Sequence, residues 1–383
     1  MSKLNELLAQ WRHHIHQHPE TAFEEFRTAS FVAEKLSEMG IEVTTGIGGT
    51  GVVGTLTVGS GKKVVGLRAD MDAIVLQEEG TASYKSECDG KMHGCGHDGH
   101  TITLLGAAKL LSENRDFNGT VRFLFQPAEE PGKGAHAMMD DGLLERFPMD
   151  ELYGLHNNPS YPGGSINICK GGFCSAEDNF KIDIHGRGGH ASSPENTIDP
   201  LIIASQIILA LQTIPSRNAG AFQPVVVSCT EIFSDGAHNA IPSNVTILGD
   251  CRSYTREAQE LIETRMHDIV DGICRASGAD YDFLYTHEFA PTINWDEQVD
   301  IVTAAAAKIV GEEKVVKNSA PFMGSEDFGA FIEKVPGAFF FLGTATGDPD
   351  KDYPLHNSRF DYNDTYLEVG ARIFAQIVRD RLK

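Results

Sequence analysis

Several side chains that can bind a metal ion lie close together in the segment HGCGHDGH, residues 93–100. Cys95 and His97 are separated by one residue, and the glycines on either side allow the loop to bend both donors toward one ion. Histidines near the start of a helix can instead cap the helix or lie in solvent. The close spacing of cysteine, histidine and glycine favours a metal site.

Two adjacent glutamates, Glu129 and Glu130, follow the apolar stretch VRFLF in the segment QPAEE. Adjacent carboxylates repel each other, so both are stable only in solvent or near a cation. In hydrolytic metal sites one carboxylate can bind the ion while its neighbour takes the proton from a water molecule. On its own, however, a pair of glutamates is more often a solvated turn.

Two further histidines follow apolar residues, His156 in GLHNN and His356 in PLHNS. A single histidine of this kind is more typical of a structural role than of catalysis. Together with the donors above, they complete a set large enough for one or two transition-metal ions of the zinc or manganese type. The candidate ligands are Cys95, His97, Glu130, His156 and His356.

Three polar residues in the middle of the chain are candidates for binding a substrate. Glycines around His190 in HGRGGHASSPE would let the backbone approach a ligand closely, although a solvated loop is the alternative. Asn239 in HNAIPSN and Arg252 in GDCRSY occupy loop or strand-end positions. Arg252 could bind a carboxylate through two hydrogen bonds, or be an ordinary exposed strand residue.

The histidine-rich segment WRHHIHQHPE near the start of the chain is interpreted as structural. Its histidines are spaced irregularly across a helix end, so most of them cannot face one ion together. They are His13, His14, His16 and His18.

The first half of the chain alternates strand and helix patterns, which predicts an α/β fold with a largely parallel central sheet. Strands are predicted at 51–58, 62–70, 120–126 and 151–157, and helices at 29–40 and 101–114. In such sheets the ligand-binding groups gather at the carboxyl ends of the strands. The segments RADMDA, QPAEE and HNN come at the carboxyl ends of these strands, just after KKVVGL, VRFLF and ELYG, which favours a common site over scattered surface charge.

Between about 175 and 290 the pattern changes to the order β-α-β-β-α-β, which is typical of a small α+β domain. Helix and strand patterns resume afterwards in VDIVTAAAAKIVG and GAFFFLGTAT. We therefore expect a first domain formed by residues 1–174 and 291–383, with an α+β domain of residues 175–290 inserted into it.

Charge and cysteine content limit the class of protein. The 383 residues include 54 acidic and 32 basic side chains, and the net charge of -22 argues against nucleic acid and anionic membrane surfaces as partners. The seven cysteines are odd in number and scattered, which is not the pattern of a disulfide framework. The sequence shows neither the apolar region of a signal peptide nor an apolar run long enough to span a membrane, so a cytoplasmic protein is expected.

Taken in order, a series of short motifs resembles the M20 metallopeptidase family, specifically its aminoacylase-like amidohydrolase branch. That branch includes hippurate hydrolases, auxin-conjugate amidohydrolases and N-acetyl-diaminopimelate deacetylases. The resemblance spans nearly the whole chain, and it depends on the ordered set rather than on any one motif. The motifs are HPETAFEE, RADMDA, HGCGHDGH, QPAEE, LHN, GRGGHAS, NAIPSN, GSEDF and PLHNS.

The resemblance implies a catalytic metal-binding domain with an inserted lid or dimerisation domain. It implies that the five donors named above are the metal ligands and that Glu129 is the general base and acid. Asp72 then resembles the residue that orients a ligand histidine from behind. His190 resembles the group that stabilises the oxyanion, supplied in family dimers by the neighbouring subunit. Asn239 and Arg252 are candidates for holding the carboxylate of the amino-acid half of the substrate.

The expected function is metal-dependent hydrolysis of the amide bond of N-acyl amino acids, such as N-acetyl or N-benzoyl compounds, by a homodimer. The wider family carries His-x-Asp where this chain reads RADMDA and offers Cys95, so zinc, manganese, cobalt and nickel all remain candidates, as one or two ions. The alternatives are a dipeptidase or carboxypeptidase, an N-carbamoyl amidase, or a non-catalytic metal- or peptide-binding protein. Glu129 beside Glu130 argues against the last, and the absence of a CxxC pair weakens a redox role.

Overall fold

The computed structural model describes residues 2–383 and divides into two compact units, each described by itself. Unit 1 contains the chain up to Phe173 together with Ile293–Pro321 and Asp327–Lys383. Unit 2 contains Cys174–Thr292 and Phe322–Glu326, so it interrupts the sequence of unit 1. Two short strands, β7 (Gly171–Cys174) and β14 (Thr292–Asn294), lie where the chain enters and leaves the longer segment of unit 2.

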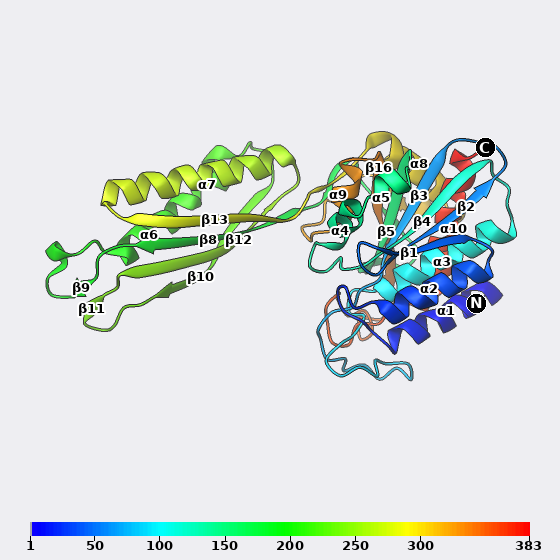
Figure 1. Ribbon diagram of the computed structural model, residues 1–383, viewed down its shortest axis with the longest axis horizontal. Helices are drawn as coiled ribbons and strands as arrows, with labels where there is room; N and C mark the ends of the chain where they lie inside the picture. Colours follow the sequence, from blue (N-terminus) through cyan, green and yellow to red (C-terminus); the bar gives the residue numbers. More distant parts are fainter. Residues whose placement is uncertain (1) are drawn as a thin grey trace. The chain divides into compact units, whose positions relative to one another are not determined.

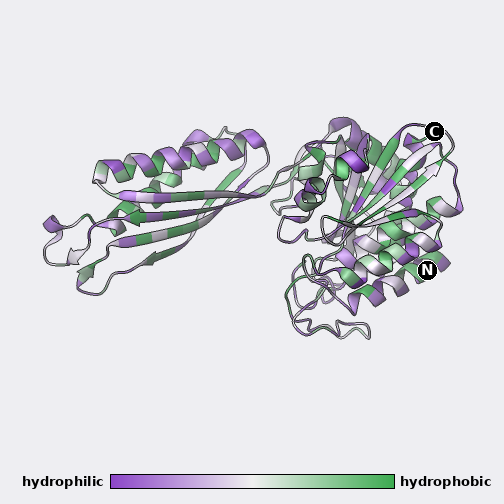
Figure 2. Cartoon of the chain, in the orientation of Figure 1, coloured by the Kyte–Doolittle hydropathy of each residue, from purple (hydrophilic) through white to green (hydrophobic). Residues whose placement is uncertain are grey.

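Unit 1 is built on an eight-stranded sheet with the order β1-β2-β4-β3-β5-β16-β6-β15. Its central neighbours β4, β3, β5 and β16 run parallel, as predicted, so their carboxyl ends lie at one edge. Strand β16 and most of β5 are buried, as expected for a sheet covered on both faces (Figures 1 and 2). The strands are β1 (Glu42–Ile47), β2 (Gly51–Val58), β3 (Val64–Asp70), β4 (Gly119–Gln126), β5 (Glu151–Pro162), β6 (Ile166–Asn167), β15 (Val315–Val316) and β16 (Gly337–Ala345).

Two groups of helices cover this sheet. Helices α3 and α10 pack against each other and, with α1, α2 and α8, share one apolar core with the strands. Helix α4 contacts α9 and β4, and Figure 1 shows this smaller group on the other side of the sheet. The helices are α1 (Lys3–His16), α2 (Phe26–Glu38), α3 (His97–Glu113), α4 (Gly134–Asp140), α5 (Leu143–Arg146), α8 (Asp296–Val310), α9 (Phe328–Ile332) and α10 (Leu367–Arg381).

Unit 2 has the predicted element order β-α-β-β-α-β. Its four strands form an antiparallel sheet in the order β10-β12-β8-β13, and helices α6 and α7 form a separate apolar core with it (Figure 1). A short two-stranded pair, β9 with β11, completes the unit. The elements are β8 (Ala176–His185), β9 (Gly189–His190), α6 (Pro200–Leu211), β10 (Val225–Ser234), β11 (Ala240–Ile241), β12 (Asn244–Ser253), α7 (Arg256–Ser277) and β13 (Asp280–Phe289).

Two local predictions differ in detail from the structure. The strand predicted at 151–157 extends to Pro162, because the pairing of β5 with β16 continues beyond Asn157, so the whole HNN segment lies inside β5. Helix α3 begins at His97 rather than at Thr101, after Gly96 turns the chain with a φ of 93°. His97 and His100 therefore belong to the first turn of a helix rather than to a loop.

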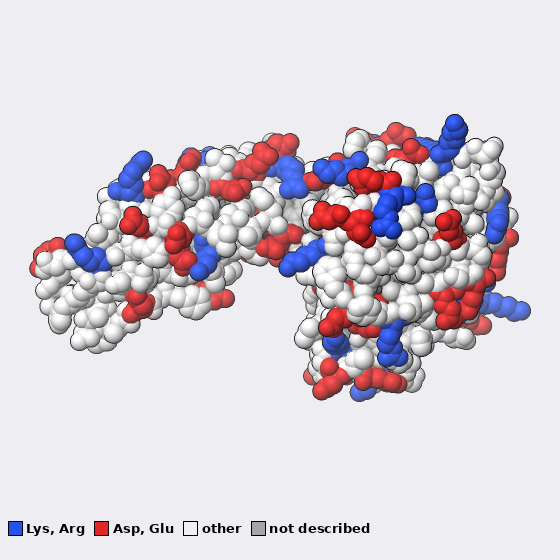
Figure 3. Space-filling view, viewed as in Figure 1, with Lys and Arg blue, Asp and Glu red and all other residues white. Residues whose placement is uncertain are grey.

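The surface and the helices add two observations. On the face shown in Figure 3, lysines and arginines of residues 2–383 are interspersed with acidic side chains and form no continuous basic area. Within the same residues, every helix is too short or too polar to cross a membrane.

Candidate metal centre

Asp72 organises the edge of the sheet where β3 and β4 end. One of its oxygens, Oδ1, accepts the backbone N–H of Glu129 at 3.0 Å, and Oδ2 accepts that of Glu130 at 3.1 Å. Oδ1 also lies 3.2 Å from Nδ1 of His97. When His97 donates its Nδ1–H to this carboxylate, its Nε2 is left to bind an ion.

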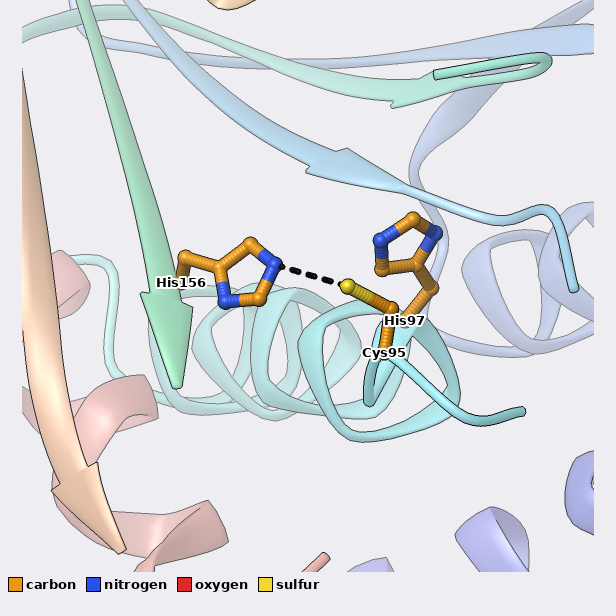
Figure 4. A group of neighbouring side chains, drawn as sticks. All are labelled: Cys95, His97 and His156. Carbon is orange, nitrogen blue, oxygen red and sulfur yellow. Dashed lines mark hydrogen bonds between the residues drawn. The ribbon is translucent and has the colours of Figure 1, made fainter. Parts of the chain in front are cut away.

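The structure brings the five expected ligands together in two overlapping groups. Cys95, His97 and His156 form one group, and Cys95, Glu130 and His356 form the other; within each group the ligand atoms lie within 4.8 Å of one another. Figure 4 shows the ring of His156, from β5, facing the sulfur of Cys95, with His97 beside it at the start of α3. Cys95 belongs to both groups, and together they offer enough donors for one or two ions.

Short distances join the donors within each group and between the two groups. Sγ of Cys95 lies 3.4 Å from Nε2 of His156. Oε1 of Glu130 lies 3.4 Å from Nε2 of His356 and 3.8 Å from Nε2 of His97. Such spacings bring donors of three chemical kinds, sulfur, nitrogen and oxygen, to one place.

His356 reaches this place from the far end of the sequence. Its backbone is in the left-handed region, with a φ of 62°, and its N–H donates to the carbonyl of Gly94 at 2.8 Å. This hydrogen bond fastens the PLHNS loop to the segment that carries Cys95. The side chain of His356 remains 54% exposed, which leaves this side of the group open to solvent.

Burial controls the protonation of the donors. Burial raises the pKa of the Cys95 thiol, and the nearby Glu130 carboxylate acts in the same direction. Burial lowers the pKa of His156 well below its ordinary value, so its ring is neutral. Nδ1 of His156 lies 2.6 Å from the carbonyl oxygen of Asn157, which leaves Nε2 as the ligand atom. Burial also opposes the charge of Glu130, but His356 and His97 more than offset this and lower its pKa.

The donor set fits a divalent transition metal. Within residues 2–383, Nε2 of His97 and Oε1 of Glu130 are buried without a hydrogen bond of acceptable geometry. A cation between them would satisfy both atoms, and the mixture of thiolate, imidazole and carboxylate suits zinc, manganese, cobalt or nickel. The alternative of a solvated glutamate pair is excluded, because only 6% of Glu129 and 18% of the Glu130 side chain are exposed.

Glu129 occupies a different position relative to the candidate ligands than Glu130 does. Its Oε2 lies 3.9 Å from Nε2 of His97, and with His97 and Glu130 it forms a further group of possible ligands, although it belongs to neither group that contains Cys95. It is therefore a buried carboxylate beside the candidate ligands, where proton transfer to or from a reacting molecule is possible.

A buried polar network that the sequence did not reveal lies next to the ligands. Nδ1 of His100 lies 2.7 Å from Oδ1 of Asp70, and the N–H of Asn157 donates to Nε2 of His100 at 3.0 Å. Arg68 donates to the other oxygen of Asp70 at 2.8 Å. The rings of His100 and His156 are 4.3 Å apart, so this network packs directly behind a candidate ligand. The only signal in the sequence was that Asp70 and His100 belong to the same two motifs as Asp72 and His97.

The N-terminal histidines contact the centre only indirectly. His16 is buried, and its Nδ1 lies 2.8 Å from Asp98, the residue after His97. Its Nε2 faces Glu78 at 3.4 Å, and the two carboxylates more than offset burial and raise the pKa of His16 to about 9. The buried guanidinium of Arg12 also donates to Asp98, at 3.2 Å.

His190 and Asn239 lie together in unit 2. His190, in β9, pairs with Ala240, and the carbonyl of Asn239 accepts the N–H of Ala191 at 3.0 Å. Nδ1 of His190 accepts the N–H of Ser192 at 3.2 Å. In the neutral ring the proton is therefore on Nε2, which can donate to a ligand.

Arg252 lies at the other end of the same unit, near the end of β12. Its Nη1 lies 2.7 Å from Glu177, and its Nε lies 2.9 Å from Asp250. Asn244, close to Asn239 in sequence, pairs with His185 at the opposite end of β12. Eight residues of strand separate Asn244 from Arg252, or roughly 27 Å. Within one chain, Asn239 and Arg252 are therefore too far apart to bind the same small carboxylate.

Residues 66–380 match the family model of Peptidase family M20/M25/M40. The chain is also 42% identical to a hippurate hydrolase of Campylobacter jejuni, over 97% of this chain and 96% of that protein. It belongs to the M20 family. This confirms the resemblance of the ordered motifs, and it makes the M20 chain a metal-dependent amidohydrolase, as expected.

Other relatives of this chain have names that refer to different hydrolytic activities. The chain is 37% identical to an N-acetyl-L-cysteine deacetylase of Bacillus subtilis, over 96% of this chain and 86% of that protein. It is 38% identical to thermostable carboxypeptidase 2 of Saccharolobus solfataricus, over 97% and 94%. A solved structure of a dinuclear metal binding peptidase from Bacillus subtilis superposes with a TM-score of 0.86 at 30% identity, covering 99% of this chain and 98% of that one. The fold of this chain is thus that of an M20 peptidase that binds two metal ions.

Proposed function

We propose that this M20 enzyme hydrolyses the amide bond of N-acyl amino acids with acyl groups such as acetyl or benzoyl. The observation that carries the proposal is a second buried carboxylate beside the candidate ligands. Glu130 lies in a group with Cys95 and His356, whereas Glu129 is grouped with His97 and Glu130 but not with Cys95. The similarity to a hippurate hydrolase and to an N-acetyl-L-cysteine deacetylase supports this class of substrate.

In the proposed mechanism the chain's own residues move the protons. A divalent ion held by the five ligands would polarise the amide carbonyl and activate the attacking water. Glu129 takes the proton of that water and later delivers it to the nitrogen of the leaving amine. His190, with its proton on Nε2, donates a hydrogen bond to the oxyanion of the tetrahedral intermediate.

We further propose a homodimer that forms through unit 2 and completes this site. Strand β10 is an edge strand of its sheet, and its side chains Ile232 and Phe233 are about half exposed. Helix α6 exposes Ile202 and Leu209, at 58% and 73%. An exposed strand edge beside apolar side chains is typical of a surface that pairs with another chain.

The separation of Asn239 from Arg252 also supports the dimer. If one substrate carboxylate is held by Arg252 of one chain and Asn239 of another, the distance between them within a chain is no obstacle. His190, which lies beside Asn239, would then be supplied by the second copy as well. The seven free cysteines support the proposed cytoplasmic location.

The first experiment separates the base from the ligand. Enzyme stripped by a chelator is restored with zinc, manganese, cobalt or nickel, and amine release is measured from N-acetyl and N-benzoyl amino acids and from dipeptides. Glu129→Gln should keep its metal and lose about a hundredfold or more in kcat. The matched variant Glu130→Gln should instead lose metal affinity. A Glu129→Gln enzyme with wild-type turnover would refute the assignment of the base.

The substrate panel also tests a second candidate function. The similarity to thermostable carboxypeptidase 2 favours cleavage of a peptide bond next to a free carboxylate. Faster release from dipeptides than from N-acyl amino acids would favour that activity over the one proposed.

Mixing two inactive variants tests whether the site is shared between subunits. Glu129→Gln and His190→Ala are combined under conditions that exchange subunits. If His190 acts on the neighbouring chain, mixed dimers contain one complete site and activity returns. If the mixture stays as inactive as its parts while mixed dimers are present, His190 acts within its own chain.

A further inference from the structure

Glu25, the last residue of the motif HPETAFEE, is fully buried next to the turn that carries the glutamate pair. Its Oε1 accepts the backbone N–H of Ala128 at 2.9 Å and that of Phe23 at 2.9 Å. Its Oε2 accepts the hydroxyl of Thr50. The exposed fraction of Glu25 is 0%, so these contacts replace solvent completely.

The contact with Ala128 falls where the backbone is strained. Ala128 has a φ of 50°, a left-handed conformation that residues with a Cβ rarely adopt. Such a conformation persists only when the surrounding contacts hold it in place. Here the residue that follows the strained position is Glu129, so the direction of its side chain depends on this turn.

Three consecutive N–H groups of the turn are bound by two buried carboxylates. Ala128 donates to Glu25, while Glu129 and Glu130 donate to the two oxygens of Asp72. Asp72 also contacts His97, so its role combines the ligands and the turn. Within residues 2–383, the hydrogen bonds of Glu25 go to Phe23, Thr50 and Ala128 and to no candidate ligand, so the part of the centre that they reach is the turn.

We propose that Glu25 is a positioning residue that holds the left-handed turn at Ala128 and thereby aims the carboxylate of Glu129 at the reacting water. This inference rests on the proposed role of Glu129 as the base. Every group that bonds to the Glu25 carboxylate is a donor, two N–H groups and one O–H, so the side chain must act as an acceptor at both oxygens. A glutamine at this position would have to turn an NH₂ group toward one of these donors.

The test compares Glu25→Gln with Glu20→Gln. Glu20 belongs to the same motif and also accepts backbone N–H groups, from Arg27 at 3.0 Å and Thr28 at 2.9 Å, but at the start of α2. We expect Glu25→Gln to lower kcat by about tenfold to a hundredfold, the size of effect that a small misplacement of a catalytic group produces. KM and metal content should stay within about twofold, because the ligands are untouched. Glu20→Gln should keep the wild-type kcat.

A second substitution separates positioning from a general need for a buried acid. Glycine adopts positive φ without the penalty that alanine carries, so Ala128→Gly should relieve the turn of its dependence on Glu25. The double variant Glu25→Gln/Ala128→Gly should therefore recover at least several-fold in kcat over Glu25→Gln. No recovery would show that the loss does not arise at this turn and would overturn the inference.

Two further measurements keep the result interpretable. If Glu25→Gln fails to fold, Thr50→Val removes one contact of Glu25 and leaves its carboxylate; a kcat lowered a few-fold supports the inference, and an unchanged kcat overturns it. Glu129→Gln is measured in parallel. If that variant is inactive while Glu25→Gln has the wild-type kcat, only the inference about Glu25 fails. If Glu129→Gln is fully active, the proposed base itself is wrong.

Discussion

Replacing Asp72 by asparagine tests how far the metal centre depends on one carboxylate. Its two oxygens serve three groups: Oδ1 contacts the N–H of Glu129 and Nδ1 of His97, and Oδ2 accepts the N–H of Glu130. An asparagine keeps one acceptor oxygen. If that oxygen takes the place of Oδ1, the NH₂ group faces the N–H of Glu130, and one buried donor loses its partner.

The size of the effect follows from this count. A buried N–H left without a partner costs about 1–3 kcal/mol. Removing the partner of a metal-binding histidine typically costs about 10- to 100-fold in metal affinity, which corresponds to a similar free energy. We therefore expect Asp72→Asn to bind metal roughly 10- to 100-fold more weakly and to lose kcat as well, because the same residue fixes the backbone of Glu129.

Competition with a coloured chelator at constant pH measures the metal affinity, and saturating metal isolates the effect on kcat. Asp150→Asn is a matched control, since Asp150 accepts the N–H of Val64 at 2.8 Å on the exposed side of the sheet. That control should change neither quantity. An Asp72→Asn enzyme with wild-type metal affinity would refute the reasoning, because it would mean that neither His97 nor the turn needs the carboxylate.

Two further predictions concern protonation. Burial raises the pKa of Cys95, so the thiol keeps its proton until an ion binds; metal uptake near pH 7 should release a proton, and the apparent affinity should rise with pH. Calorimetry in two buffers of different ionisation enthalpy measures this release, and an uptake without proton release would contradict a thiolate ligand. The Asp98 and Glu78 carboxylates raise the pKa of His16 from 6.5 to about 9 in the folded chain. The resulting stabilisation, about 3 kcal/mol, should be complete below pH 6.5 and disappear as the pH rises through 9. Denaturant unfolding of the wild type and of His16→Gln at pH 6 and pH 9.5 tests this, and a difference between the two proteins that does not shrink at high pH would show that the charge of His16 does not stabilise the fold.

The donors of the centre were recognisable in the sequence because their chemistry and spacing are local properties. HGCGHDGH and QPAEE each carry their donors within a few residues. The alternation of strands and helices predicted a parallel sheet, whose carboxyl ends meet at one edge. Those two facts were enough to expect that the end of β4 and the start of α3 share a site.

Other parts of the centre depend on contacts between distant segments. His356 reaches the metal centre because the PLHNS loop is hydrogen-bonded to Gly94. The residues next to His356 in the sequence do not predict this contact. The position of Glu25 in its motif predicts no role for it. That role depends on the contact of its carboxylate with the N–H of Ala128, a residue far away in the sequence. The placing of His156 inside β5 likewise depends on how far β5 pairs with β16.

The sequence by itself determined the family, the α/β class, the inserted α+β segment and the chemical types of the ligands, since composition, periodicity and motif order are written along the chain. Only the tertiary structure decided which donors converge, which carboxylates are buried, and that Asn239 and Arg252 lie far apart within unit 2. The physical reason is that burial and long-range contact arise from the packing of segments far apart in sequence. Local patterns carry no measure of the distance between such segments.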